Sequence, residues 1–172
     1  MTQPANSAPD TGVRVSEMPP SARFSLRLRA DRIEAAGHAL GFGLPQRIGA
    51  ITAHGNWRAL CLGPDEWLLE GPDGTQPPLP PEGLPHALVD ISNREIVFCI
   101  EGRHTLDLLS IGIARDLRRL APGNGCRTAF DSAQAILIRE TEASFTLAVW
   151  RSFAPMVSGL LSIGLRELET GL

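Results

Sequence analysis

The chain has 172 residues, of which 43% are hydrophobic and 20% charged, a balance that is typical of one globular domain and excludes a disordered or fibrous protein. Sixteen basic residues, all arginine, stand against 19 acidic ones, and the net charge of −3 argues against an unspecific nucleic-acid binder. The lack of lysine excludes a Schiff-base enzyme and a Walker-type phosphate loop, and no apolar run is long enough to span a membrane.

The first part of the chain differs in composition from the rest. Residues 1–22 contain four prolines and few large apolar groups, which predicts a flexible tail. The tail has neither the basic start nor the apolar core of a secretory signal, so we expect a cytoplasmic protein. Residues 23–172 are predicted to form a single α+β domain.

Helix and strand signals alternate along this domain in two similar units. Asp31 is expected to cap a first helix that runs to residue 40, a second helix is expected over 102–110, and a last one over 152–169. The proline-rich stretch 71–85 is predicted to be a surface loop. The predicted strands are 24–28, 48–53, 57–62, 67–69, 86–91, 95–100, 126–130, 134–139 and 145–150. Two strand-helix-strand-strand units favour a ferredoxin-like or pseudo-duplicated fold.

The residues that most often carry chemistry lack the spacing that chemistry needs. The four histidines have no metal-binding pattern, and the three cysteines, Cys61, Cys99 and Cys126, fit neither a zinc site nor a redox pair. No serine or cysteine lies in a nucleophile-elbow sequence. The sequence therefore predicts no catalytic, cofactor-binding or metal site on this chain.

A polar cluster stands between two apolar strands, where side chains from neighbouring strands can converge. It contains Asp90, Ser92 and Arg94. One interpretation is an Asp90–Arg94 pair that fixes the turn, and the other is a contact with a ligand or a partner.

The last helix has an unusually wide apolar face. Its central residues are Phe153, Met156, Val157, Leu160 and Leu161, and no charged residue occurs from 152 to 165. Such a helix either lies between layers of its own fold or binds a different chain through this face. We favour the second interpretation and expect these five residues to form a partner interface.

Three segments resemble the gamma subunit of heterotetrameric sarcosine oxidase. They are LGPDEWLL at 62–69, VDISNR at 89–94, and RSFA at 151–154 at the start of the last helix. The second segment is also similar to the folate-binding domain of glycine-cleavage aminomethyltransferases, so the resemblance implies an aminomethyltransferase-like fold.

The resemblance also implies a function. Such an assembly oxidises sarcosine to glycine with formation of hydrogen peroxide and passes the one-carbon unit to tetrahydrofolate. It implies that the alpha and beta subunits hold FAD, FMN and NAD, that the delta subunit holds zinc, and that the gamma chain packs against the larger subunits. This chain departs from the family at Asn93, where a histidine is typical, and at 132–134, where aminomethyl-transfer enzymes carry acidic residues.

The hypothesis from the sequence is thus a non-catalytic subunit that supports assembly of the flavin-bearing alpha and beta subunits. One alternative is a stand-alone folate-binding or one-carbon-transfer protein that uses the region from Asp90 to Arg94 as part of a pterin pocket. Another is a homo-oligomeric binding module unrelated to sarcosine.

Overall fold

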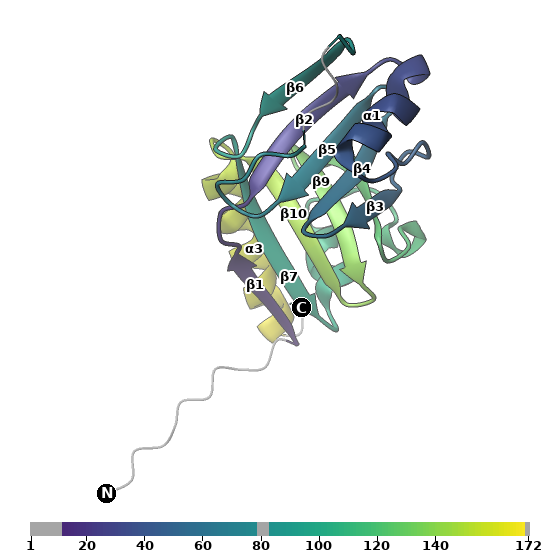
Figure 1. Ribbon diagram of the computed structural model, residues 1–172. Coiled ribbons are helices and arrows are strands. Elements are labelled where there is room, and N and C mark those ends of the chain that lie inside the picture. The colour runs from purple at the N-terminus through teal and green to yellow at the C-terminus, as the bar shows by residue number, and fades with distance from the viewer. Residues whose placement is uncertain (1–11, 79–82, 171–172) are drawn as a thin grey trace, which may run out of the picture.

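The computed structural model describes residues 12–78 and 83–170, drawn in colour in Figure 1. These residues form two five-stranded sheets, and every strand pair in them is antiparallel. Three α-helices accompany the sheets, and no helix in the described part of the chain is both long and apolar enough to cross a membrane. The predicted α+β class is confirmed.

The first sheet has the strand order β3-β4-β5-β2-β6 and carries one helix. The bounds of its elements are β2 (Ala22–Leu28), η1 (Ala30–Arg32), α1 (Ile33–Leu40), β3 (Ile51–His54), β4 (Trp57–Gly63), β5 (Glu66–Gly71) and β6 (His86–Asp90). The described residues between β5 and β6 form neither helix nor strand, as their prolines predicted; residues 79–82 of that stretch lie outside the described residues.

The second sheet has the order β1-β7-β10-β9-β8 and carries two helices. The bounds of its elements are β1 (Val13–Glu17), β7 (Glu95–Gly102), α2 (Thr105–Ser110), η2 (Leu117–Arg119), β8 (Asn124–Phe130), β9 (Ala133–Thr141), β10 (Ser144–Trp150) and α3 (Ala154–Thr170). The predicted strands and helices are all present, with ends that differ by a few residues.

The two sheets repeat one pattern and exchange one strand. The run β2-α1-β3-β4-β5 and the run β7-α2-β8-β9-β10 place their strands in the same order, which confirms the two-unit organisation. However, β1 pairs with β7 of the second unit, and β6 pairs with β2 of the first. The strand that precedes each unit in the sequence, β1 or β6, therefore joins the sheet of the other unit. The chain crosses between the sheets twice, from β1 to β2 and from β6 to β7.

Strand β1 corrects the prediction of a tail over residues 1–22. Residues Val13–Glu17 pair with β7 from Gly102 to Phe98, and Val13 is buried in the core of the second sheet. The composition alone suggested that the entropy lost on ordering would exceed the gain from contacts. Backbone pairing with β7 and the alternating Val13 and Val15 offset that entropy. Residues 1–11 of the predicted tail lie outside the described residues.

The first helix begins differently from the prediction. Asp31 lies inside the short 3₁₀ turn η1, next to the exposed Arg32, and its side chain does not cap α1. The end of the helix is as predicted, because Gly41 adopts a left-handed conformation with φ of 76° and its N–H donates to the carbonyls of Gly37 and His38.

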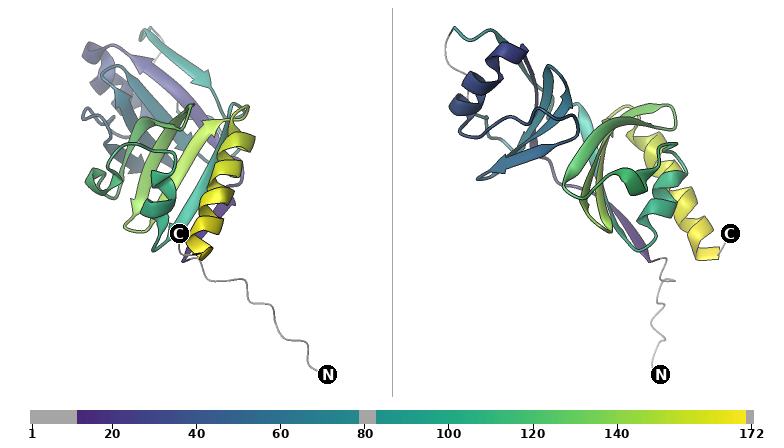
Figure 2. Two further views of the ribbon diagram at one scale, coloured as in Figure 1. Left: turned by 180° about the vertical axis from the view of Figure 1, so that it is seen from behind. Right: turned by 90° about the vertical axis from the view of Figure 1, so that its right-hand side faces the viewer.

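The elements stack as helix, sheet, sheet and helices (Figure 2). One core lies between α1 and the first sheet, around the fully buried Trp67, whose Nε1 donates to the carbonyl of Pro45 at 2.7 Å. A second core lies between the second sheet and the helices α2 and α3. A third apolar layer joins the facing sheets through Leu60, Leu68, Ile136, Ile138 and Ala148. This shared layer supports the single domain expected for residues 23–172, which stays a prediction.

Candidate functional site

The segment from Asp90 to Ser92 ties the end of β6 to β2. The Asp90 carboxylate accepts hydrogen bonds from the hydroxyl of Ser92 at 2.6 Å and from its backbone N–H at 2.9 Å. The Ser92 hydroxyl oxygen in turn accepts from the backbone N–H of Arg23 at 2.9 Å. The hydrogen bonds from Ser92 hold the pKa of Asp90 below its ordinary value. Asp90 and Ser92 are thus turn residues whose hydrogen-bonding groups are engaged within the fold.

The side chain of Arg94 does not take part in this turn. The guanidinium is exposed, and among the described residues it forms no ion pair and no hydrogen bond, so the Asp90–Arg94 pair considered above is not formed. The backbone of Arg94 is fixed, since its N–H donates to the carbonyl of Ile91 at 2.9 Å and its carbonyl accepts from the N–H of Arg151 at 2.8 Å. The Arg94 side chain is therefore an unpaired cation among the described residues, and its backbone is fixed by two hydrogen bonds.

Arg94 borders a hollow of about 140 Å³ at the junction of the two sheets. Trp150, the last residue of β10, also lines the hollow and is 50% exposed. We call this feature the Trp150 hollow. The hollow is also lined by Ser25, Glu66, Ile91, Glu95, Arg127 and Gln134.

A charged network that joins the two sheets forms part of the same hollow. Glu66 of β5 receives two hydrogen bonds from the guanidinium of Arg127 on β8, at 2.5 and 3.0 Å, and one from Arg27 at 3.0 Å. The hydrogen bond from Arg127 is the main reason why the pKa of Glu66 lies below its ordinary value. Charged hydrogen bonds of this bidentate kind fix the orientation of both partners.

Acid is expected to weaken the contact between the sheets through Glu66. Because the folded chain lowers this pKa, the stabilisation is complete above about pH 4.3, the ordinary pKa of glutamate, and is lost as the pH falls through the lower folded value. Glu66→Gln should therefore flatten the decline of the urea midpoint between neutral and acidic pH. The exposed Glu34→Gln serves as the control, and an equally steep decline in both variants would contradict this role of Glu66.

A second charged group lies elsewhere between the sheets, and we call it the Arg23 cluster. The guanidinium of the buried Arg23 pairs with Glu70 and, at 2.9 Å, with Glu95. Arg58 joins Glu70 at 2.6 Å and Glu140 at 2.9 Å, so the cluster connects both sheets. A hollow of about 330 Å³ adjoins Arg23, Arg58 and Glu70. Three carboxylates against two guanidinium groups leave the cluster one negative charge in excess, which disfavours an anionic ligand.

The structure corrects the interface predicted on the last helix. Val157 and Leu161 are buried to 0% and 1% exposure in the core under α3, so they do not bind a partner. The wide apolar face is explained by α3 packing on both its own sheet and α2, where Gly164 lies against Leu108 and Ile111. Phe153, Met156 and Leu160 are half-buried along the margin of the same core, and a partner role for them stays a prediction.

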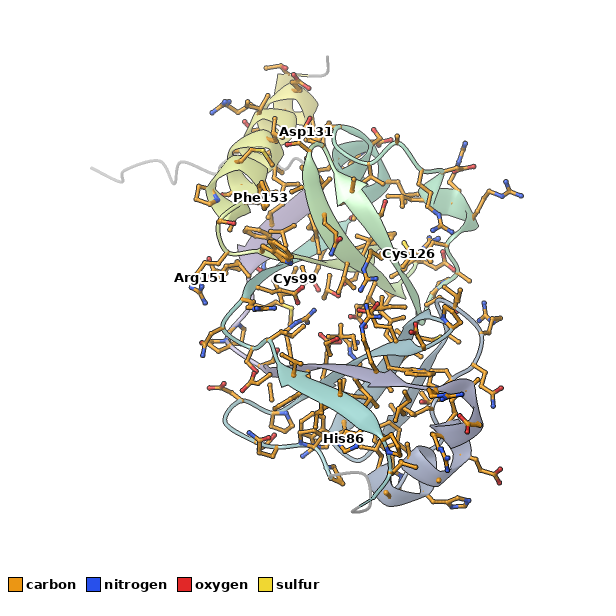
Figure 3. All side chains as sticks on the ribbon, turned by 90° about the horizontal axis from the view of Figure 1, so that it is seen from above. His86, Cys99, Cys126, Asp131, Arg151 and Phe153 are labelled. Carbon is orange, nitrogen blue, oxygen red and sulfur yellow. The ribbon has the colours of Figure 1, made fainter. Side chains whose placement is uncertain are left out.

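Within the described ranges, no cysteine or histidine lines the Trp150 hollow. Burial raises the pKa of the thiols of Cys61, Cys99 and Cys126, which disfavours the nucleophilic thiolate. In the described part of the chain no three His, Cys, Asp or Glu side chains are arranged to hold a metal ion. Arg151 and Phe153 lie together where β10 leads into α3, whereas His86 lies on the other sheet (Figure 3).

Sequence reasoning identified Arg94 but not Trp150 or Arg127. Trp150 ends a strand that is buried on both faces, so no alternation of polar and apolar residues marks it as exposed. Arg127 and Glu66 are 61 positions apart, and nothing in their local sequences indicates the pairing. The one available signal is that Trp150 and Arg151 directly precede a helix whose first charged residue is Arg166.

Comparison of the fold with solved structures gives a match over nearly the whole chain. Heterotetrameric sarcosine oxidase from Corynebacterium sp. U-96, solved in complex with pyrrole 2-carboxylate, contains a chain that superposes with a TM-score of 0.81 at 23% sequence identity. The match covers 91% of this chain and 85% of that one. The two chains share one fold. The resemblance seen in the sequence is thus confirmed at the level of the architecture.

A second match is to the other kind of protein that the sequence resembles, a glycine-cleavage aminomethyltransferase. Glycine cleavage system aminomethyltransferase T from Bartonella henselae superposes with a TM-score of 0.70 at 11% identity, over 87% of this chain and 45% of that chain. The fold is therefore aminomethyltransferase-like, with two five-stranded sheets rather than a single ferredoxin-like sheet. No protein-family model and no curated protein sequence matches this chain.

Proposed function

We propose that this chain is a small non-catalytic subunit of a heterotetrameric sarcosine oxidase and supports the assembly of the flavin-bearing alpha and beta subunits. The main support is the extent of the match to the Corynebacterium enzyme, because the similarity spans most of both chains. The aminomethyltransferase, in contrast, is about twice as long as the region that corresponds to this chain. The closer superposition, with a TM-score of 0.81 against 0.70, favours the sarcosine oxidase chain over the transferase as the counterpart.

In this proposal the reaction belongs to the complex. The larger subunits would hold FAD, FMN and NAD, and sarcosine would be oxidised there to glycine, with the one-carbon unit passed to tetrahydrofolate and the two electrons passed to dioxygen, which becomes hydrogen peroxide. The contribution of this chain would be a rigid surface, since its charged side chains between the sheets are mostly paired with one another. That this chain holds no cofactor of its own stays a prediction.

The alternative, a stand-alone folate-binding protein, receives less support from the site. The Trp150 hollow, at about 140 Å³, is smaller than the roughly 300–1,000 Å³ of pockets that enclose drug-sized ligands. Asp90, the acidic residue that a pterin would most readily use in the predicted pocket, is already engaged by Ser92. The Trp150 hollow therefore does not fit a complete folate.

Co-expression tests the proposal. The tagged chain, produced together with the alpha and beta subunits of a sarcosine oxidase, should be recovered in a complex that has the visible absorbance of flavin. Calorimetry of the isolated chain with tetrahydrofolate should give no heat of binding. Recovery of the chain alone, with tight folate binding, would favour the one-carbon-transfer alternative.

A further inference from the structure

We infer that the Trp150 hollow is the docking site for an acidic segment of a larger subunit, with a carboxylate of that segment paired to Arg94 and an apolar side chain laid against Trp150. The inference rests on the proposed function, since the partner is a subunit of that assembly. It assigns the contact to the junction of the two sheets instead of the apolar face of α3, which the core of the chain occupies.

Trp150 is exposed in a way that favours a partner. An indole that is half exposed next to a hollow leaves a large apolar area in water, and burial of an aromatic side chain is among the largest single contributions to binding. Ile91 lines the same hollow and is half-buried, so the hollow offers a second apolar side chain besides the indole. The indole N–H has no acceptor among residues 12–78 and 83–170.

The charge around the hollow defines the partner. Arg94 has no carboxylate partner in the described part of the chain, and the neighbouring Arg151 uses its Nε only to donate to the carbonyl of Asn93 at 3.1 Å. The two acidic residues that line the hollow already have cationic partners, Glu66 in Arg127 and Glu95 in Arg23, and Asp90 is engaged by Ser92. Glu17, which lines an adjoining hollow with Arg151, forms no ion pair with it. Two unpaired cations on a chain with a net charge of −3 therefore favour an acidic partner.

The backbone that carries these side chains is already ordered. Glu95 and Trp150 are paired in register between β7 and β10, and the Arg151 N–H donates to the Arg94 carbonyl. A partner would thus meet Arg94 and Trp150 at fixed positions, and little backbone entropy would be lost on binding. The size of the hollow suits one inserted side chain, because it is well below that of a cofactor pocket.

The test measures the affinity of the full chain for the co-expressed larger subunits. Trp150→Ala and Arg94→Glu should each weaken binding by roughly tenfold or more, the range of interface hot spots, and the wild-type affinity should fall as salt is added. Controls of matched type are Ile48→Ala, which removes another exposed apolar side chain, and Arg119→Glu, which reverses another exposed arginine. All four variants should keep the wild-type unfolding midpoint.

The outcomes separate the two proposals. If the wild-type chain binds the larger subunits and both hollow variants bind within about twofold of it, the docking site is wrong while the proposed function stands. If the wild-type chain does not bind them, the proposed function is wrong and this inference with it. Tetrahydrofolate binding by the isolated wild-type chain that both hollow variants lose would instead assign the hollow to a small ligand and overturn the inference.

Discussion

Leu161→Arg is expected to abolish cooperative folding, whereas Ser162→Arg, one position further along α3, is expected to fold as the wild type does. Leu161 is 1% exposed within the core of the second sheet, so an arginine there would bury a charge without a partner. Such changes cost more than about 4 kcal/mol, which is comparable to the whole stability of many domains. Ser162 faces solvent on the other side of the helix.

Thermal unfolding followed by circular dichroism distinguishes the two variants. A sharp transition for Ser162→Arg and none for Leu161→Arg would agree with a helix whose apolar face packs on its own sheet. A sharp transition for both, together with lost binding to larger subunits for Leu161→Arg alone, would show that the sequence-based interface on α3 was right and the packing described here wrong.

Glu70→Ala is expected to give the second largest loss of stability. The Glu70 carboxylate pairs with both Arg23 and Arg58, and Arg23 is 3% exposed. Removal of one member of a buried ion pair leaves the other charge buried without full compensation, at a cost of about 3–5 kcal/mol. Glu95 would remain beside Arg23, which places the expected loss near the lower end of that range.

Urea unfolding at neutral pH measures this loss. Asp31→Ala provides the control, because among the described residues its carboxylate pairs only with the exposed Arg29 and Arg32 and should contribute little. The urea midpoint of Glu70→Ala should lie well below that of Asp31→Ala. If both variants keep a midpoint close to that of the wild type, the Arg23 cluster does not hold the sheets together.

The local pattern of the sequence was enough to predict the elements. Alternation in β2, the glycine that ends α1 and the prolines before β6 each act within a few residues, so their consequences can be seen without the tertiary structure. The repeated order of elements predicted the two units for the same reason.

Features that depend on distant partners could not be predicted in this way. Val13–Glu17 is ordered because β7 is available to pair with it about 85 positions later, from Phe98 to Gly102, and its own composition points to a tail. The wide apolar face of α3 was assigned to a partner because the packing of α2 against Gly164 depends on the tertiary structure and has no signal in the local sequence. Arg94 was found as part of a turn motif, but its freedom from any carboxylate, and the closeness of Trp150, appear only in the fold.

Native mass spectrometry of the chain co-expressed with the alpha and beta subunits of a sarcosine oxidase tests the central proposal most directly. We expect one particle that contains this chain together with both larger subunits and their flavins, and less of that particle for Trp150→Ala. A spectrum in which this chain is found only by itself, beside fully assembled flavin-bearing subunits, would contradict the account.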